Sequence, residues 1–397
     1  MQTPLKCQRY EFSIDPNNEG HIWLNSAYMG PLPLRAQRAG EAAMKARAFP
    51  ASITSRDFFE PAERVRTLLA TLVSTETERI AFVPNVANGM AIVAKNFEPK
   101  RGQNVVLLGE QFPSNVYPWR VWHEAGVEIR TIAAPDAPWS ASISGKRSRA
   151  TLWNEAILNA IDANTAMVSI EQAHWTDGTL FDLLSIGRRC RGVGALFVID
   201  ATQTVGAMPL NCEAIQPDAL VVHSYKSMLS NYGLGFAVFS DRFANAKPLE
   251  ESWLMRAGSD NFARLVDYQD AYDRGMRRFD TSLRVNPSLI NMLGESAACL
   301  LEWQPSRIRE YLLDIERGFV DRVRLMGFEV ADEDERAANI FGLKMPAHIN
   351  IEVCRAALAA RKIHVSVRGS AIRVSPHVYN SAEDLLMLAN ALADCVK

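Results

Sequence analysis

The sequence predicts an α/β fold, with a large domain built on a mostly parallel, two-sided sheet and a small α+β C-terminal domain. From about Glu78 to Ser240, short apolar runs alternate with amphipathic stretches, which is the pattern of βαβ units. After Asp241 the pattern changes to a long, polar, arginine-rich stretch that precedes an apolar helix. A chain of 397 residues is also too long for one ordinary core.

The elements of the large domain follow from apolar runs and their spacing. Short β-rich runs predict strands, and stretches whose apolar residues share one face predict helices that pack on the sheet. The predicted strands are 80–83, 105–108, 166–170, 195–199, 220–222 and 235–239, with helices at 88–96 and 183–190. The Ala-, Pro- and Ser-rich piece 133–148 is predicted to be a surface loop.

The last third of the chain predicts a smaller unit of mixed elements. Helices are expected at 288–303 and 306–326, strands around Phe328, Phe341 and Ile372, and a final helix that begins after Ser381. We therefore predict an N-terminal arm at 1–20, a large domain at 21–255 and a small C-terminal domain at 256–397.

Composition excludes several classes of function. The formal net charge is -2 and basic runs are short, so we expect no nucleic-acid partner. The first residues lack an apolar signal core and no stretch approaches the ~18 apolar residues of a membrane span, so neither export nor a membrane location is expected. The six cysteines are scattered without metal-like spacing, which predicts no metal site and a reducing, cytoplasmic setting.

Polar residues follow two neighbouring predicted strands. Asp200 and Gln203 come after the strand 195–199, while His223, Tyr225 and Lys226 come after 220–222. In an open α/β sheet the ligand crevice lies outside the carboxyl ends of the strands, so these side chains are expected to converge.

The lysine is the residue with the most specific chemistry. A lysine just after an apolar strand is poorly hydrated, which lowers its pKa and favours imine formation. The alternative for Lys226 alone is a side chain that extends to solvent, and for Asp200 alone a helix N-cap. Together they indicate a site for pyridoxal phosphate (PLP), because an aspartate that pairs with a protonated pyridine nitrogen keeps the ring an electron sink.

The motifs at these positions resemble a known family. D-A-T-Q at 200–203, followed by S-Y-K-x-x-L-x-x-Y-G-L-G-F at 224–236, resembles the fold-type-I PLP enzymes of the class V aminotransferase group, which includes cysteine desulfurases, kynureninases, isopenicillin-N-epimerase-like proteins and transaminases. The resemblance extends to W-L-N-S-A-Y-M-G-P-L-P at 23–33 and R-V-S-P-H-V-Y-N at 373–380. It implies a seven-stranded-type sheet and PLP as cofactor.

The resemblance also implies roles by position. Lys226 would form the internal aldimine with PLP and carry the α-proton, Asp200 would bind the pyridine nitrogen, and Gln203 would lie near the phenolic oxygen. His223 and Tyr225 would add side-chain donors. The phosphate would bind backbone N–H groups of the segment 85–89, which includes Val86, Ala87 and Asn88. Relatives often carry Ser or Thr where Val86 and Ala87 stand.

Aromatic residues are assigned to the cofactor on the same basis. Phe112 resembles the aromatic that stacks on the pyridine ring, with plain core packing as the alternative. Trp175 falls where relatives contact the phenolic oxygen. Trp253 and the stretch 278–288 resemble regions that reach the neighbouring subunit's cofactor, which implies a homodimer with shared sites.

The substrate side is assigned to four residues. Arg373 is the candidate for the substrate carboxylate, because a guanidinium pairs with a carboxylate in a bidentate fork. Arg368 is a second, weaker candidate, and a surface arginine is the alternative for both. Ala27 and Tyr28 belong to the first turn, which lies on the substrate side in the family.

Differences between this sequence and the family motifs reduce the number of candidate reactions. Desulfurases carry a cysteine shortly before the C-terminal arginine motif, and 367–371 contains none. Kynureninase agreement is partial, because Ala27 and Tyr28 replace its Asn-Ser. We therefore expect transamination of a small amino acid. The alternatives are a lyase, by β-elimination or kynureninase-like C–C cleavage, an epimerase, or a non-catalytic protein on the same fold. A dinucleotide-binding enzyme is disfavoured, because the turn at 85–89 has only Gly89 of the required glycines.

Overall fold

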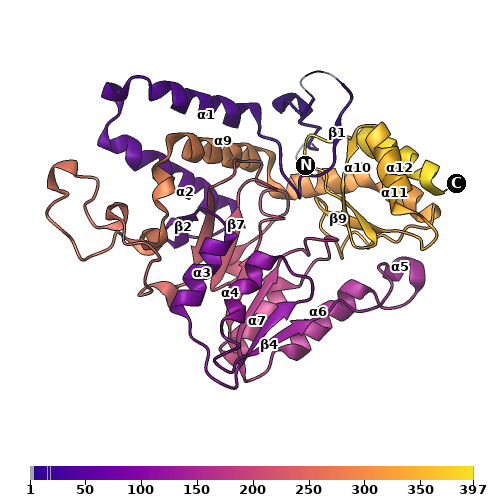
Figure 1. Cartoon of the computed structure of the whole chain (residues 1–397), viewed down its shortest axis with the longest axis horizontal. Helices are drawn as coiled ribbons and strands as arrows, with labels where there is room; N and C mark the ends of the chain where they lie inside the picture. The colour runs from indigo at the N-terminus through magenta and orange to yellow at the C-terminus, as the bar shows by residue number, and fades with distance from the viewer. Residues whose placement is uncertain (1–3, 16, 18, 397) are drawn as a thin grey trace.

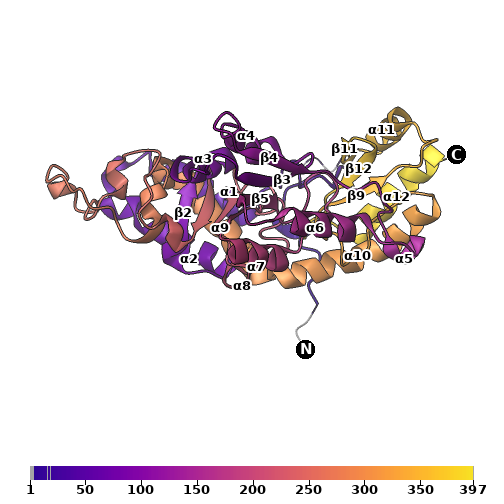
Figure 2. The ribbon, with the colours of Figure 1, turned by 90° about the horizontal axis from the view of Figure 1, so that it is seen from below.

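The computed structural model describes residues 4–15, 17 and 19–396 and confirms the α/β architecture. A seven-stranded sheet occupies the larger part of the molecule, and a three-stranded sheet lies with α10, α11 and α12 at the C-terminal end (Figure 1). Seen from below, the molecule is elongated, with helices on both sides of the large sheet (Figure 2). None of the described helices is both long and apolar enough to cross a membrane.

The large sheet has the strand order β2-β8-β7-β6-β5-β3-β4. Neighbours from β7 to β4 are parallel, whereas β8 runs antiparallel to both β2 and β7. The mostly parallel, seven-stranded sheet is therefore confirmed. The strands are β2 Ile80–Val83, β3 Asn104–Leu108, β4 Glu128–Ile132, β5 Thr165–Glu171, β6 Leu196–Asp200, β7 Ala219–His223 and β8 Gly235–Phe239.

Twelve α-helices surround the sheets in the described part of the chain. They are α1 Leu34–Ala46, α2 Glu60–Leu72, α3 Val86–Asn96, α4 Tyr117–Arg120, α5 Ala141–Ser144, α6 Arg149–Ala160, α7 Leu183–Val193, α8 Cys212–Ile215, α9 Pro287–Trp303, α10 Pro305–Leu325, α11 Ile351–Ala360 and α12 Ala382–Val396. The predicted loop at 133–148 contains the short helix α5.

The sheet is two-sided because successive side chains of each strand point to opposite faces. In β3, Val106 and Leu108 join a core with α2, α7 and α9, while Val105 and Leu107 join a second core with α3. Burial on both faces explains why the central strands read as continuous apolar runs.

The small sheet has the order β11-β12-β9, all antiparallel, with β9 Phe341–Lys344, β11 Ser366–Arg368 and β12 Ala371–Val374. A predicted strand around Phe328 is not formed, because the chain there makes only an isolated bridge between Glu329 and Lys344. Near the N-terminus, β1 Ile22–Trp23 pairs in parallel with β10 Ile363–His364.

Packing crosses the predicted domain limits in two places. Helix α9 packs on α1 and α2, with Ile290 and Leu293 in the core of the large sheet. Conversely, Ile22 and Leu24 pack in the C-terminal core. The division of the chain at 256 stays a prediction, and the N-terminal segment connects the two cores.

Candidate active site

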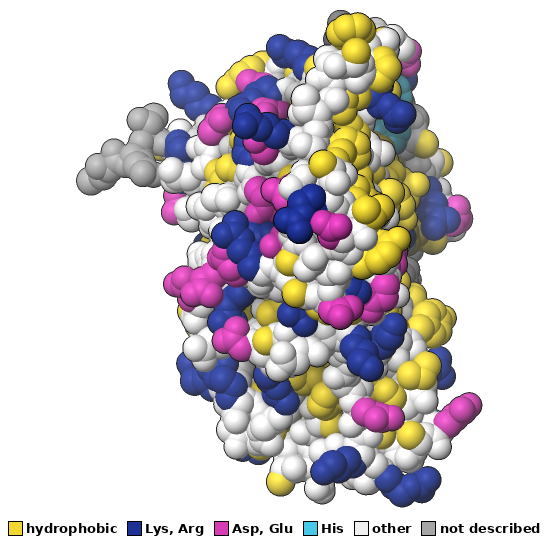
Figure 3. Space-filling model, turned by 90° about the vertical axis from the view of Figure 1, so that its left-hand side faces the viewer, with side chains coloured by type: hydrophobic (Ala, Val, Ile, Leu, Met, Phe, Trp, Pro, Cys, Tyr) yellow, Lys and Arg dark blue, Asp and Glu magenta, His cyan; other side chains and the backbone are white. Residues whose placement is uncertain are grey.

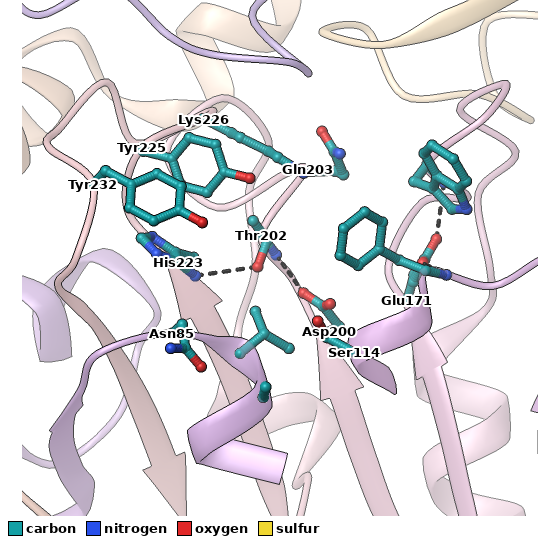
Figure 4. Close-up of a pocket in the computed structure, with 14 residues that line it drawn as sticks. Asn85, Ser114, Glu171, Asp200, Thr202, Gln203, His223, Tyr225, Lys226 and Tyr232 are labelled. Carbon is teal, nitrogen blue, oxygen red and sulfur yellow. Dashed lines mark hydrogen bonds between the residues drawn. The ribbon is translucent and has the colours of Figure 1, made fainter. Parts of the chain in front are cut away.

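A cavity of about 250 Å³ lies at the carboxyl ends of β5, β6 and β7, where the sequence predicted a crevice (Figure 4). The predicted residues that line it are Val86, Ala87, Phe112, Trp175, Asp200, Gln203, His223, Tyr225 and Lys226. Asn85, from the segment 85–89 expected at the phosphate, also lines it, and sequence reasoning did not assign four further lining residues to the cofactor, namely Ser114, Glu171, Thr202 and Tyr232.

Lys226 comes three residues after the end of β7 and extends across the cavity toward Gln203 (Figure 4). Its Nζ lies 4.9 Å from the centroid of the Phe112 ring, and the residue is only 6% exposed. Burial lowers the pKa of Lys226 to about 8. A substantial fraction of the amine is therefore neutral and nucleophilic near neutral pH.

The glycine of the first turn allows a close approach to this lysine. Gly30 donates its N–H to the Tyr225 carbonyl at 2.9 Å. A Cβ at Gly30 would lie 2.2 Å from the Lys226 carbonyl oxygen, far inside van der Waals contact. Residues 25–30 therefore pack directly on the turn that carries the lysine, which only glycine permits here.

Asp200 is the last residue of β6 and presents a buried carboxyl to the cavity. Its Oδ1 accepts the N–H of Thr202 at 3.0 Å, and no ion pair joins it to a cation within the described residues. Burial raises the pKa of Asp200. A buried carboxylate without a counter-ion is costly, so this position suits a bound cation such as a protonated ring nitrogen.

Two other polar side chains at the cavity carry buried polar atoms without hydrogen-bond partners. Both ring nitrogens of His223 and Oε1 of Gln203 are buried without a hydrogen bond. Burial lowers the pKa of His223 to about 4, so its imidazole is neutral. The His223 ring contacts those of Tyr225 and Tyr232, at centroid distances of 4.5 and 4.8 Å. Buried polar atoms normally form hydrogen bonds, so these atoms are available to hydrogen-bond with a polar ligand.

The N-terminus of α3 borders the same cavity. Asn85 caps the helix, with its Oδ1 accepting the N–H of Asn88 at 2.9 Å. The first-turn N–H groups of Val86 and Ala87 have no partner within the helix and, with the helix dipole, favour an anion such as a phosphate. The N–H of Asn88 is used by the cap, and Asn88 is not among the lining residues.

Glu171, the last residue of β5, is the most informative residue that sequence reasoning missed. It is adjacent to Asp200 in the sheet register and 3% exposed. Its Oε1 accepts the N–H of Phe112 at 3.1 Å, and its Oε2 accepts the N–H of Trp175 at 2.8 Å. Burial and the charge of Asp200 raise the pKa of Glu171 to about 8. A carboxyl at the end of an apolar strand was the available signal.

Phe112 and Trp175 are held in a defined arrangement by this carboxyl. Their rings are perpendicular, with centroids 5.5 Å apart. The indole N–H of Trp175 donates to the Glu110 carbonyl at 2.7 Å. The contact of this indole with a cofactor oxygen stays a prediction, and Trp175 lines the cavity.

Two of the four predicted substrate residues lie beside Trp175, and the other two lie near Gln203 and Tyr225. The guanidiniums of Arg373 and Arg368 lie 6.0 and 5.3 Å from the Trp175 ring centroid. Ala27 is buried, and its carbonyl accepts a hydrogen bond from Gln203 at 3.4 Å. Tyr28 is 56% exposed and close enough to Tyr225 to influence its pKa.

Trp253, another predicted cofactor residue, lies away from this cavity. It packs against Phe59 and Phe262 and lines a separate cavity formed by 251–270. Within a single copy of the chain, the structure does not bring Trp253 to the Lys226 cavity.

Fold and site together define a PLP-dependent enzyme of fold type I: the N-terminus of α3, a buried aspartate and a buried lysine converge on one cavity. Residues 50–388 match the model of the family Aminotransferase class-V, and the chain belongs to this family.

Known relatives agree with this assignment. The uncharacterized aminotransferase YcbU of Bacillus subtilis is 25% identical over 83% of this chain and 82% of its own. Isopenicillin N epimerase of Amycolatopsis lactamdurans is 24% identical over 98% of both chains. The structure of a C-DES mutant with glycine covalently linked to its PLP cofactor superposes with a TM-score of 0.82 at 16% identity, covering 98% of this chain and 99% of that one.

Proposed function

We propose that this enzyme transaminates a small amino acid, with Lys226 as the residue that holds the cofactor and moves the α-proton. The observation that carries the proposal is the buried Lys226 amine, whose pKa is lowered to about 8, in a cavity shared with Asp200. PLP bound there would supply an electron sink for the bond that is broken.

The residues of the chain would bind the cofactor, transfer the proton and bind the substrate. The carboxylate of Asp200 would keep the ring nitrogen protonated, and the N–H groups of Val86 and Ala87 would hold the phosphate. Nζ of Lys226 would take the proton from the substrate carbon and return it. Arg373 would bind the substrate carboxylate.

Two observations favour transamination over its alternatives. None of the lining residues is a cysteine, the nucleophile expected for persulfide-forming desulfuration. A relative that matches 83% of the chain carries an aminotransferase name. The similarity to an epimerase over 98% of both chains supports epimerisation as a second candidate, since it shares the proton removal. Lyase reactions, by β-elimination or kynureninase-like C–C cleavage, are the remaining alternatives to transamination.

Product analysis distinguishes these reactions. The PLP-loaded protein is incubated with single amino acids, with and without an acceptor keto acid, and pyridoxamine phosphate, ammonia and the two enantiomers of the donor are quantified. We expect pyridoxamine phosphate and a keto acid. Ammonia release would identify a lyase and loss of optical purity an epimerase.

The role of Lys226 has its own test. Lys226→Ala should lose the visible absorption band of the lysine-bound cofactor, whereas the exposed control Lys247→Ala should keep it. Wild-type protein that stays colourless with added PLP contradicts the proposal, because the buried lysine would then not bind the cofactor.

We also propose a homodimer located in the cytoplasm. The segment 251–274 projects from the end of the molecule opposite the C-terminal sheet, and it exposes Trp253, Val266 and Tyr268. Hydrophobic side chains gather on that end among charged ones (Figure 3). Burial of this segment on a second copy would bring Trp253 near the partner's cavity. Unpaired cysteines throughout favour a reducing compartment. Sedimentation of wild type against Tyr268→Glu tests the dimer.

A further inference from the structure

Two arginines beside the cavity carry positive charge that no acidic side chain balances. Arg373, on β12, is 1% exposed, and Arg368, on β11, is half-buried. Nearly every other buried arginine pairs with a carboxylate, as Arg336 does with Glu316 at 2.7 Å. Neither Arg368 nor Arg373 forms an ion pair with any described residue.

The hydrogen bonds of these arginines are weak substitutes for an anion. Arg373 donates from Nη1 to the Trp175 carbonyl at 3.0 Å and from Nη2 to Oγ of Ser366 at 3.3 Å. Arg368 donates only to the carbonyl of Val367, its neighbour, at 2.8 Å. The Nε atoms of both arginines are buried without an acceptor. Two guanidiniums thus have donors left for a ligand.

The two charges act on the same region. They flank one aromatic ring, that of Trp175, which lines the Lys226 cavity. Burial, followed by the charge of Arg368, lowers the pKa of Arg373 to about 9. Both arginines also help to lower the pKa of Lys226. Two guanidiniums therefore flank the Trp175 side of the cavity, and one substrate carboxylate could pair with only one of them.

We propose that Arg368 forms a second anion-binding position, and that the substrate is an amino acid with a side-chain carboxylate. This inference rests on the proposed function in one respect, since it assumes that Arg373 holds the α-carboxylate of an amino acid. Arg368 then acts as a specificity-determining residue: a dicarboxylic substrate pairs with both guanidiniums, whereas a monocarboxylic one leaves Arg368 desolvated and unpaired.

Binding of unreactive acids tests this without turnover. The affinities of succinate and glutarate are compared with that of propionate on the PLP-loaded enzyme by titration calorimetry. We expect the better dicarboxylate to bind about 10-fold to 100-fold more tightly, the range that a charged hydrogen bond gives. Arg368→Gln should remove this advantage, because it lowers the affinity for dicarboxylates far more than the affinity for propionate. Arg373→Gln should weaken all three acids.

A matched control separates local from general charge effects. Arg355, on α11, is an exposed arginine of the C-terminal unit that pairs with Glu352 at 2.8 Å. Arg355→Gln should leave all affinities unchanged. Equal wild-type affinities for mono- and dicarboxylates would overturn the inference. So would an Arg368→Gln variant that weakens the oligomer but not dicarboxylate binding, since a partner's carboxylate would then be the ligand.

The outcome for the reaction is distinguishable from the outcome for the binding site. If dicarboxylates bind through Arg368 but no amino acid is transaminated, the proposed reaction fails and the anion site stands. If transamination is observed only with monocarboxylic donors and is insensitive to Arg368→Gln, the reaction stands and the second anion position fails.

Discussion

Replacing Glu171 by glutamine should make the stability of the cofactor-free protein less dependent on pH. The pKa of Glu171 is raised from the ordinary 4.5 to about 8 in the folded chain. The folded state therefore prefers the protonated carboxyl. Above pH 4.5 the unfolded chain releases this proton and the folded chain does not, so the carboxyl destabilises the fold by about 1.4 kcal/mol for each pH unit, up to about pH 8.

The magnitude at neutral pH follows from this slope. Roughly 2.5 units separate 4.5 from pH 7, which corresponds to a cost of about 3 kcal/mol. A glutamine has no such cost, but it leaves one of two backbone N–H groups without an acceptor, at about 1–3 kcal/mol at every pH. Glu171→Gln should thus be destabilising at pH 5 and near neutral or stabilising at pH 7.

The measurement is urea unfolding of the cofactor-free protein at pH 5, 6 and 7. The difference in unfolding free energy between Glu171→Gln and wild type should change by about 3 kcal/mol in favour of the variant over this range. The exposed control Glu213→Gln should show no such trend. A difference that stays constant from pH 5 to pH 7 would mean that Glu171 is ionised throughout and that the reasoning is wrong.

Three further predictions concern the lysine and its supports. The rate at which the cofactor-free protein captures PLP should rise with pH and level off above about 8, because the pKa of Lys226 sets the fraction of neutral amine. Asp280→Asn should cost about 3–5 kcal/mol in thermal or urea unfolding, because it removes the buried carboxylate that pairs with both Arg66 and Arg284, whereas the exposed control Asp241→Asn should cost little. Gly30→Ala should impair activity without unfolding the protein, read by turnover together with circular dichroism, because its Cβ meets the lysine turn.

The central strands were predictable because strands buried on both faces consist of continuous apolar runs. Every strand of the large sheet except β4 has only buried residues, and each was predicted to within one or two residues. Strand β4 lies at the sheet edge, and its residues, such as Glu128, are exposed or half-buried. Unlike β2 at the opposite edge, whose residues are all buried, β4 has no continuous apolar run, so periodicity could not reveal it.

The site was predictable where residues lie close in sequence or match a family motif. Asp200 and Lys226 end neighbouring strands, and their convergence follows from the topology of a parallel sheet. Glu171 was not predicted as a site residue because its hydrogen-bond partners lie outside its own strand. Its Oε1 holds the N–H of Phe112, a contact across 59 positions that only the fold reveals.

The position of the substrate arginines relative to the lysine is the least local property of the site. Arg373 belongs to the C-terminal sheet and Lys226 to the large one, and residues 25–30 bind both. The N–H of Ser26 donates to the Ser375 carbonyl at 3.0 Å, two residues beyond Arg373, while the N–H of Gly30 donates to the Tyr225 carbonyl at 2.9 Å, next to Lys226. This short segment therefore sets the spacing between the guanidinium that we propose for the substrate carboxylate and the amine that we propose for the cofactor, although the glycine-proline turn is far from both in sequence.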